Sequence, residues 1–254
     1  MATCLTGGGE GGRSTDPAGK EVLVFTPTPN EYQAVKRRVA ETAFSNIKVR
    51  VLESGPGKIN AAFKMAAEVL PGLARGHRPA FLVGAGTAGS LNLEMASGDL
   101  IASTSCVISD WRMEDGRASQ HGAYGQFVYE PLSAGLAESI ALNCLDRTAS
   151  RLMEHLGAQG FKRGRLMTSD TFVAGREHKL SLGRDFAALA CDMESGAFAF
   201  TAQNLLGGLP WFNLRIVADS LDQSLADYFS MEIDLVEILG ARTAEALQAL
   251  DRLI

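Results

Sequence analysis

Apolar and polar positions form blocks along the chain that predict strands and helices in turn. Short apolar runs are typical of buried strands, and longer stretches with apolar residues every three or four positions are typical of helices. We expect strands within residues 21–25, 47–54, 79–86, 99–109, 161–170, 185–194 and 210–220. An irregular loop should follow residue 170. We expect helices within residues 31–43, 59–74, 133–157, 194–207 and 231–254. Pro71 and Gly72 should end the second of these.

This alternation predicts an α/β fold with helices on both faces of a central sheet. Residues 1–20 are rich in Gly, Ser, Thr and Asp, which is typical of a flexible N-terminal tail. Residues 21–254 contain no internal repeat and no linker, so one domain is the simplest interpretation. Residues 110–131 are polar and Gly-rich, and a loop of that length is usually functional or mobile.

Polar clusters follow several of the predicted strands. In open α/β sheets, ligands bind beyond the carboxyl ends of the strands. The clusters are TPTPNE, SGPGK, GAGTAGS, TSDTF, DME and ADS. They predict a ligand site at one edge of the sheet.

Two of these clusters resemble nucleotide-binding motifs. Gly84–Gly89 has the spacing G-x-G-x-x-G, but too few residues follow before the next strand to form a crossover helix. We expect instead a loop of backbone donors that lets a ligand approach, or a simple turn. Ser54–Lys58 lacks the first glycine and the final Ser or Thr of a phosphate-binding loop, so a structural turn is favoured over a ligand contact.

Composition narrows the class of protein. The net charge of -5 argues against nucleic acid as a partner, which usually requires a basic face. No run of 18 apolar residues indicates a membrane span, and the N-terminus lacks the apolar core of a secretory signal. Scattered cysteines without metal-ligand spacing predict free thiols in a reducing cytoplasm and no metal or other cofactor. They are Cys4, Cys106, Cys144 and Cys191.

Three acidic residues stand at separate strand ends, at Glu31, Glu194 and Asp219. Each alone is most often a solvated loop carboxylate. Together at the ligand-binding edge of one sheet they indicate acid–base chemistry. Asp192 and Glu194 flank Met193 ahead of a small, apolar helix. We expect Asp192 to face away from the ligand and to pair with a cation or a helix N-terminus.

The segments GAGTAGSL, TSDTF, CDMESGAFA and RIVADSLDQ, in that order, resemble the nucleoside phosphorylase-I superfamily of purine nucleoside and uridine phosphorylases. The chain is most similar to the branch of 5'-methylthioadenosine/S-adenosylhomocysteine nucleosidases. The resemblance runs from about Val22 to the C-terminal helix. It implies a single-domain, three-layer α/β/α fold with a central mixed and twisted sheet, which makes 21–254 the catalytic domain. It also implies a homodimer whose loops, here 111–128, cap the neighbouring site.

The resemblance assigns catalytic roles to two acids. Asp219 would protonate or strongly hydrogen-bond the departing purine at N7, and Glu31 would activate water on the opposite face of the sugar. The remaining matches would bind substrate. Glu194 would hold the ribose hydroxyls, Met193 would pack beneath the sugar, and Thr87 would lie near the nucleophile. Phe172 would stack on the base, and Val173 would give it backbone contacts. Phe229 would belong to a lid over the 5' group, beside Pro56. Arg215 would orient a carboxylate, although a purely structural ion pair is an equally open interpretation.

Hydrolysis is favoured over phosphorolysis. Phosphorylases need arginines around the Gly loop, whereas this chain has Gly84 and Glu31 at those places. The expected activity is therefore hydrolysis of the N-glycosidic bond of a 5'-modified purine nucleoside. The TPTP turn, Pro56 and Ala218 depart from the usual nucleosidase pattern. A futalosine-type hydrolase, a phosphorylase and a nucleoside-binding protein without catalysis remain the alternatives.

Overall fold

The computed structural model describes residues 20–110, 128–129, 143–221 and 225–254. Side chains are described throughout these ranges except at 104, 128–129, 143–147 and 225–233. The strands are β1 (Lys20–Thr26), β2 (Ile47–Glu53), β3 (Phe81–Ser90), β4 (Leu100–Ile108), β5 (Val128–Tyr129), β6 (Lys162–Thr168), β7 (Ala188–Asp192) and β8 (Trp211–Asp219). The helices are α1 (Pro29–Ala40), α2 (Lys58–Leu73), α3 (Asn143–Ala158), α4 (Arg176–Phe186), α5 (Ser195–Phe200), extended by a π-helical turn at Thr201–Leu205, and α6 (Leu225–Leu253).

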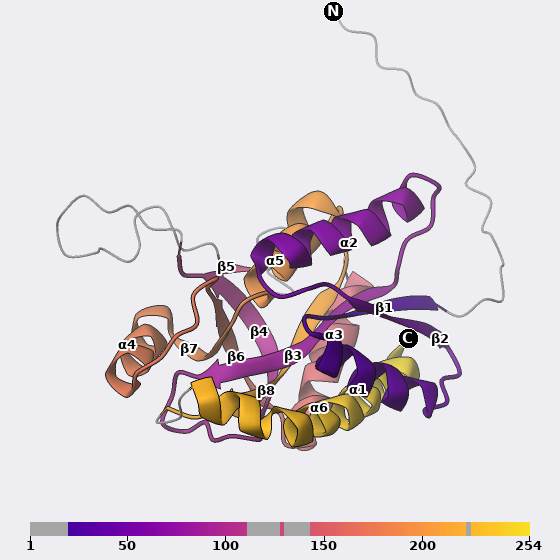
Figure 1. Ribbon diagram of the computed structural model, residues 1–254. Coiled ribbons are helices and arrows are strands. Elements are labelled where there is room, and N and C mark those ends of the chain that lie inside the picture. The colour runs from indigo at the N-terminus through magenta and orange to yellow at the C-terminus, as the bar shows by residue number, and fades with distance from the viewer. Residues whose placement is uncertain (1–19, 111–127, 130–142, 222–224) are drawn as a thin grey trace, which may run out of the picture.

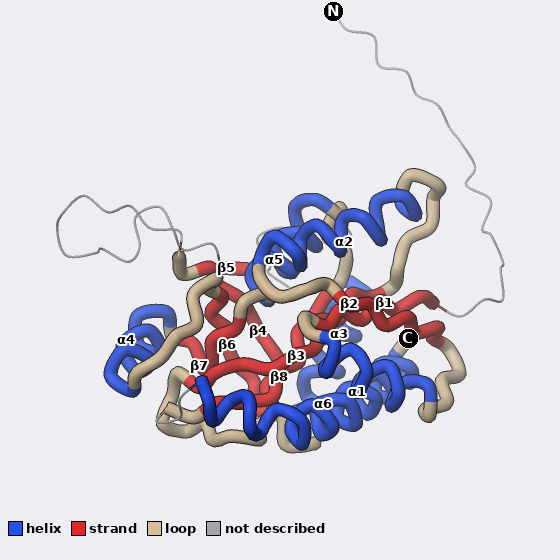
Figure 2. Tube along the Cα trace, viewed as in Figure 1, coloured by secondary structure: helices blue, strands red, loops and turns tan. Residues whose placement is uncertain are grey.

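Helices cover both faces of the sheet, as the alternating pattern predicts (Figure 1 and Figure 2). Successive side chains of a strand point to opposite faces. Val22 and Val24 therefore join the core that includes residues of α1, α3 and α6. Leu23 and Phe25 join the core that includes residues of α2 and α5. The α/β fold with two helical layers around a mixed sheet is confirmed.

The sheet is mixed, and β8 is its central strand. β8 pairs in parallel with β3 and antiparallel with β4, and all nine of its residues are buried. β4 pairs with β6, and β6 pairs with β7. β7 then returns to the end of β3, where Gly89 lies opposite Cys191. The strands β3, β8, β4, β6 and β7 thus close into a ring, in which β3 and β8 run antiparallel to β4 and β7 where they pair with them.

The expected glycine loop is wrong, because Gly84–Gly89 continues strand β3 up to Ser90. Glycine usually weakens a strand, and it persists where another group must approach the backbone closely. A Cβ added at Gly84 would lie 2.0 Å from Asn213 Oδ1, and one at Gly89 would lie 2.4 Å from Asp219 Oδ1. The glycines therefore make space for side chains of β8 rather than for a phosphate group.

Two helices differ from the prediction. Helix α4 occupies a segment where an irregular loop was expected. Helix α2 continues through Pro71 to Leu73 instead of ending at the proline. The other predicted elements are present with small shifts of their ends, and the predicted helix portion at 133–142 lies outside the described residues.

Candidate active site

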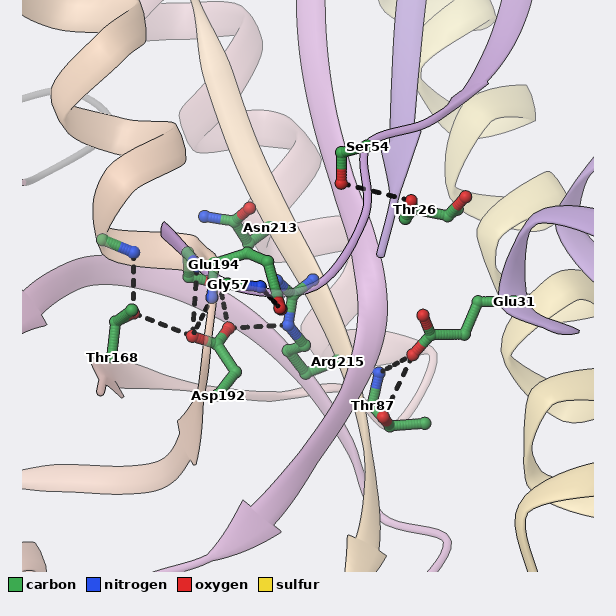
Figure 3. Close-up of polar contacts among 12 residues, drawn as sticks. Thr26, Glu31, Ser54, Gly57, Thr87, Thr168, Asp192, Glu194, Asn213 and Arg215 are labelled. Carbon is green, nitrogen blue, oxygen red and sulfur yellow. Dashed lines mark hydrogen bonds and ion pairs between the residues drawn. The ribbon is translucent and has the colours of Figure 1, made fainter. Parts of the chain in front are cut away.

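Glu31 is a buried carboxylate held by four short contacts. It occupies the third position of α1, where Thr28 caps the helix and forms a reciprocal capping box with it. Its Oε2 accepts hydrogen bonds from the backbone N–H and the hydroxyl of Thr28, both at 2.9 Å. Its Oε1 accepts from the backbone N–H of Thr87 at 2.7 Å and from the Thr87 hydroxyl at 3.0 Å (Figure 3).

The position of Glu31 is thus fixed from two elements, α1 and β3. Gly86 makes this approach sterically possible, since an added Cβ there would lie 3.2 Å from Glu31 Oε1. Burial raises the pKa of Glu31, while the hydrogen bonds from Thr87 and Thr28 and the charge of Arg215 lower it. The net direction is upward, towards the range in which a carboxylate serves as a general base near neutral pH.

Arg215 on β8 forms a buried ion pair with Asp192 at the end of β7. Its Nε lies 2.7 Å from Asp192 Oδ2, and both side chains are 1% exposed. Asp192 also accepts from the backbone N–H of Glu194 and Ser195 at the start of α5. The prediction that Asp192 pairs with a cation or a helix N-terminus is confirmed, since it does both.

Glu194 lies beside this pair and has weaker contacts. Its Oε1 accepts from the backbone N–H of Gly57 at 2.9 Å, and its Oε2 lies 3.8 Å from an Nη of Arg215 (Figure 3). Arg215 could orient Glu194 only through this longer contact, because its shorter contact is with Asp192. The Ser54–Lys58 turn therefore reverses the chain and also holds the carboxylate of Glu194 through Gly57.

Acidic groups outnumber cations in this cluster. Arg215 is the cation that contacts Asp192 and Glu194 and that acts on Glu31. Burial raises the pKa of Glu194 to about 8, with a further rise from Asp192 and an opposing effect of Arg215. Like charges in a buried site favour the protonated form of one of them. Glu194 is therefore the carboxyl of this cluster that favours its protonated form near neutral pH.

Asp219 ends β8 and pairs with Lys179 of α4, a residue that the sequence analysis missed. Lys179 Nζ lies 2.5 Å from Asp219 Oδ2, and the side chains are 1% and 3% exposed. Burial raises the pKa of Asp219, although Lys179 acts in the opposite direction. A signal was available: Lys179, Leu182 and Phe186 have helical spacing, which places a lysine on an apolar face.

An open cavity lies next to Asp219 and brings together most of the remaining predicted residues. Phe172, Val173 and Met193 line it, together with Lys179 and Asp219. Phe172 is 39% exposed, so it is no core residue and presents its ring at the surface of the site. Phe229 belongs to α6, but its side chain lies outside the description, as does segment 111–127.

A second set of charges was also missed, at the N-terminus of α2. Lys58 Nζ contacts Asp110 and lies 3.1 Å from Asp170 Oδ2. The backbone N–H of Lys58 donates to Asp170 Oδ1 at 3.0 Å. These contacts fix the turn that presents Gly57 to Glu194. They join residues far apart in sequence, so spacing alone gave no sign of them.

The described part of the chain has neither a membrane-spanning helix nor a group of metal-binding side chains. No helix there is long and apolar enough to cross a membrane. No three His, Cys, Asp or Glu side chains in those ranges are grouped so that they could hold a metal ion.

This fold and site define an α/β protein with several buried carboxylates, of which Asp219 lines a cavity that Phe172 borders. The chain belongs to the phosphorylase superfamily, whose sequence model matches residues 16–254. It is 25% identical over 209 residues to a 5'-methylthioadenosine/S-adenosylhomocysteine nucleosidase of Exiguobacterium sp., covering 82% of each chain. It is 24% identical over 202 residues to the same enzyme of Staphylococcus aureus, covering 79% of this chain and 81% of that one.

Solved structures show the same fold. The Helicobacter pylori 5'-methylthioadenosine/S-adenosylhomocysteine nucleosidase aligns with a TM-score of 0.71 and 19% identity, over 93% of this chain and 100% of that one. The futalosine hydrolase of Helicobacter pylori aligns with a TM-score of 0.70 and 19% identity, over 92% and 98%. The resemblance noted in the sequence motifs is confirmed at the level of the superfamily and its fold.

Proposed function

We propose that this protein is a nucleosidase that hydrolyses the N-glycosidic bond of a 5'-modified purine nucleoside and releases the free base. 5'-Methylthioadenosine and S-adenosylhomocysteine are the substrates named for its relatives. The catalytic domain spans residues 21–254. The proposal rests on the arrangement of carboxylates at one end of the sheet.

One observation supports it most. Glu31 lies against Gly86 and Asp219 lies against Gly89 of the same strand. Three residues of a strand span roughly 10 Å. A base and an acid at that spacing can act on opposite faces of one sugar, with a water molecule between the base and the sugar. Glu194 lies near Arg215 and close enough to Glu31 to sense its charge, and from there it would reach the ribose.

The reaction follows from these positions. Glu31 accepts a proton as water attacks the anomeric carbon, and Asp219 donates a proton to the purine as the glycosidic bond breaks. The raised pKa of each carboxyl suits its role, since Glu31 is then a better base and Asp219 is more often protonated. Thr87 keeps Glu31 in place beside the water.

The other residues bind the substrate. Glu194 accepts hydrogen bonds from the ribose hydroxyls, and Met193 packs beneath the sugar. Phe172 stacks on the base, while Val173 offers backbone contacts to it. Phe229 remains a proposed lid residue over the 5' substituent. Fixing the sugar and the base in this way lowers the entropic barrier to bond cleavage.

Hydrolysis fits the site better than phosphorolysis. The backbone N–H and hydroxyl of Thr87 are the donors that a phosphate oxygen would use, and both already donate to Glu31. A phosphate dianion would also meet the Glu31 carboxylate, which repels it. A neutral water molecule meets no such repulsion.

A futalosine-type nucleoside is the second candidate substrate. The futalosine hydrolase of Helicobacter pylori matches this fold as well as the methylthioadenosine enzyme does, with TM-scores of 0.70 and 0.71. The 5' group distinguishes these substrates. Substrate comparison therefore decides between them.

The proposal is tested by chromatographic detection of free base in phosphate-free buffer. The substrates are methylthioadenosine, S-adenosylhomocysteine, adenosine, inosine and a futalosine-type nucleoside. We expect base release without phosphate, fastest with a 5'-modified nucleoside, and loss of at least 100-fold in Glu31→Gln, about the contribution of one acid–base group. If release of the base requires phosphate and yields sugar 1-phosphate, the proposal that this protein is a hydrolase is wrong.

We also propose a homodimer formed through α2. Ile59, Phe63 and Leu70 lie on one side of this helix and are 80%, 72% and 39% exposed. A contiguous apolar stripe of this kind is typical of a protein interface. Sedimentation should show a dimer that Phe63→Glu dissociates, whereas Leu93→Glu, at an equally exposed leucine between β3 and β4, should leave it intact.

The cytoplasm is the compartment that we propose. Cys106 and Cys191 are buried free thiols, which is usual in a reducing environment. Their location in the core means that oxidation would require the protein to open.

A further inference from the structure

Lys179 is a buried lysine whose Nζ has two oxygen partners. It lies 2.5 Å from Asp219 Oδ2 and 2.9 Å from the carbonyl oxygen of Ser220. Transferring an ammonium group into a protein interior costs several kcal/mol unless it is paired and hydrogen-bonded. A lysine that served solubility alone would lie at the surface. This one instead reaches the carboxyl group to which the proposed function gives the role of acid.

Helix α4 is packed so that Lys179 has little freedom. Leu182 and Phe186 lie on the same face and are buried in a core with Leu91. Gly183 allows the helix to approach closely, since an added Cβ would lie 2.1 Å from the carbonyl oxygen of Leu91. The backbone that carries Lys179 is therefore anchored on the end of β3, where Asp219 also lies.

The two oxygens of Asp219 have different surroundings. Oδ2 accepts from Lys179, while Oδ1 lies over Gly89. Both Gly89 and Asp219 line the cavity that contains Phe172 and Met193. The ammonium group thus occupies one oxygen and leaves the other for a ligand in the cavity.

We propose that Lys179 is a positioning residue that orients Asp219 and stabilises the carboxylate formed when Asp219 gives up its proton. This inference rests on the proposed function. The proton moves from Asp219 to the purine nitrogen, the electron pair of the glycosidic bond moves onto the purine, and water supplies hydroxide to the sugar and a proton to Glu31. Lys179 stays protonated throughout, and solvent then returns a proton to Asp219 and takes up the proton that Glu31 received.

The ammonium group makes Asp219 a stronger acid than burial alone would allow. An opposite charge at this distance typically changes a carboxyl pKa by about 1–3 units. Other ionisable groups near Asp219 in the described part of the chain are Asp192, which is paired with Arg215, and the buried thiol of Cys191. His178, the neighbour of Lys179 on α4, lines an adjoining cavity instead.

The experiment compares pH profiles of kcat/KM for the natural chain, Lys179→Met and Lys179→Arg. The alkaline limb of kcat/KM reports the essential acid of the free enzyme. We expect Lys179→Met to move that limb upward by about 1–3 pH units and to lower the maximum by about 10- to 100-fold, less than the whole contribution of a general acid. Lys179→Arg keeps the charge and should keep the limb near its original pH.

Leu182→Ala is the matched control on the same face of α4. It should lower stability, measured by thermal unfolding, without moving the alkaline limb. An unmoved limb in folded Lys179→Met would overturn the inference, because a purely structural lysine predicts that result. Asp219→Asn separates this failure from a failure of the proposed function: near-normal turnover in that variant would remove Asp219 from the mechanism altogether.

Discussion

Replacing Glu194 with glutamine should change how the stability of the protein depends on pH. Burial and the neighbouring Asp192 raise the pKa of Glu194 from 4.5 to about 8, against the effects of Arg215 and Gly57. In the unfolded chain this carboxyl ionises near its ordinary value. Between about pH 4.5 and pH 8 the folded state therefore keeps a proton that the unfolded state has lost. The contribution to stability is complete below that window and is lost as the pH rises through it.

The size of the effect follows from the same two values. One pKa unit corresponds to about 1.4 kcal/mol, so the difference between 4.5 and about 8 sets an upper bound on the order of 5 kcal/mol. The charge of Asp192 raises the pKa of Glu194 and that of Arg215 lowers it, and interactions of this kind spread the effect over the charged group. We expect about half of the bound, roughly 2–3 kcal/mol, to appear in the variant.

Urea unfolding followed by circular dichroism at pH 5, 6.5 and 8 measures the free energy of unfolding of the variant and of the natural chain. Glu194→Gln is neutral at every pH, so it should match the natural chain at pH 5 and exceed its free energy of unfolding at pH 8. Glu53→Gln, at an exposed glutamate that ends β2, is the control and should follow the natural chain throughout. An equal difference between the natural chain and Glu194→Gln at pH 5 and pH 8 would refute the reasoning.

Three further variants test other parts of the site. Arg215→Met leaves Asp192 buried without its cation, so urea unfolding should show a loss of about 3–5 kcal/mol. Thr87→Val removes the hydrogen bond from the hydroxyl to Glu31 but keeps the one from the backbone N–H. The free energy of unfolding should fall by about 1 kcal/mol, and kcat should fall by a larger factor than KM rises. Gly86→Ala places a Cβ 3.2 Å from Glu31 Oε1; base release should fall at least 10-fold if an acid–base group is displaced, and unchanged kinetics would count against that role.

The succession of strands and helices along the chain and the two helical layers could be predicted, because the period of apolar residues indicates which side chains are buried. The run EVLVF places Val22 and Val24 on one face of β1 and Leu23 and Phe25 on the other, and helices cover both. Asp219 also stands where the prediction placed it, at the carboxyl end of a strand, whereas Glu194 caps α5 just after β7 and Glu31 lies in the first turn of α1. Element type and burial depend on residues that are close together in the sequence, so one sequence is enough to predict them.

Helix α4 could not be predicted in the same way. Gly175 just before the helix and Gly183 within it are usual signs of a loop, and few residues of the helix are apolar. Gly183 is needed because the helix packs onto the carbonyl oxygen of Leu91, a contact with a residue far away in sequence. The helical spacing of Lys179, Leu182 and Phe186 indicated a lysine on an apolar face, but its pairing with Asp219 depends on how that helix packs.

The glycines of β3 led to the wrong prediction of a loop, because their role also depends on contacts with residues far away in sequence. Glycine is rare inside strands, so GAGTAG indicated a loop. Each of its three glycines instead faces a side chain from another element, namely Asn213, Glu31 and Asp219. Close packing across the sheet, rather than backbone freedom, accounts for them.

The central place of β8 has a consequence for synthesis of the chain. β3 and β4 are both made long before β8, and Asn213 donates to Ser103, 110 residues earlier. At roughly 5–20 residues per second, a nascent chain would wait on the order of ten seconds for its middle strand. During that time β3 and β4 present unpaired edges that invite aggregation. Cells that make this protein therefore have reason to shelter the emerging chain until residue 219 has left the ribosome, and the acid of the site is then among the last parts to fall into place.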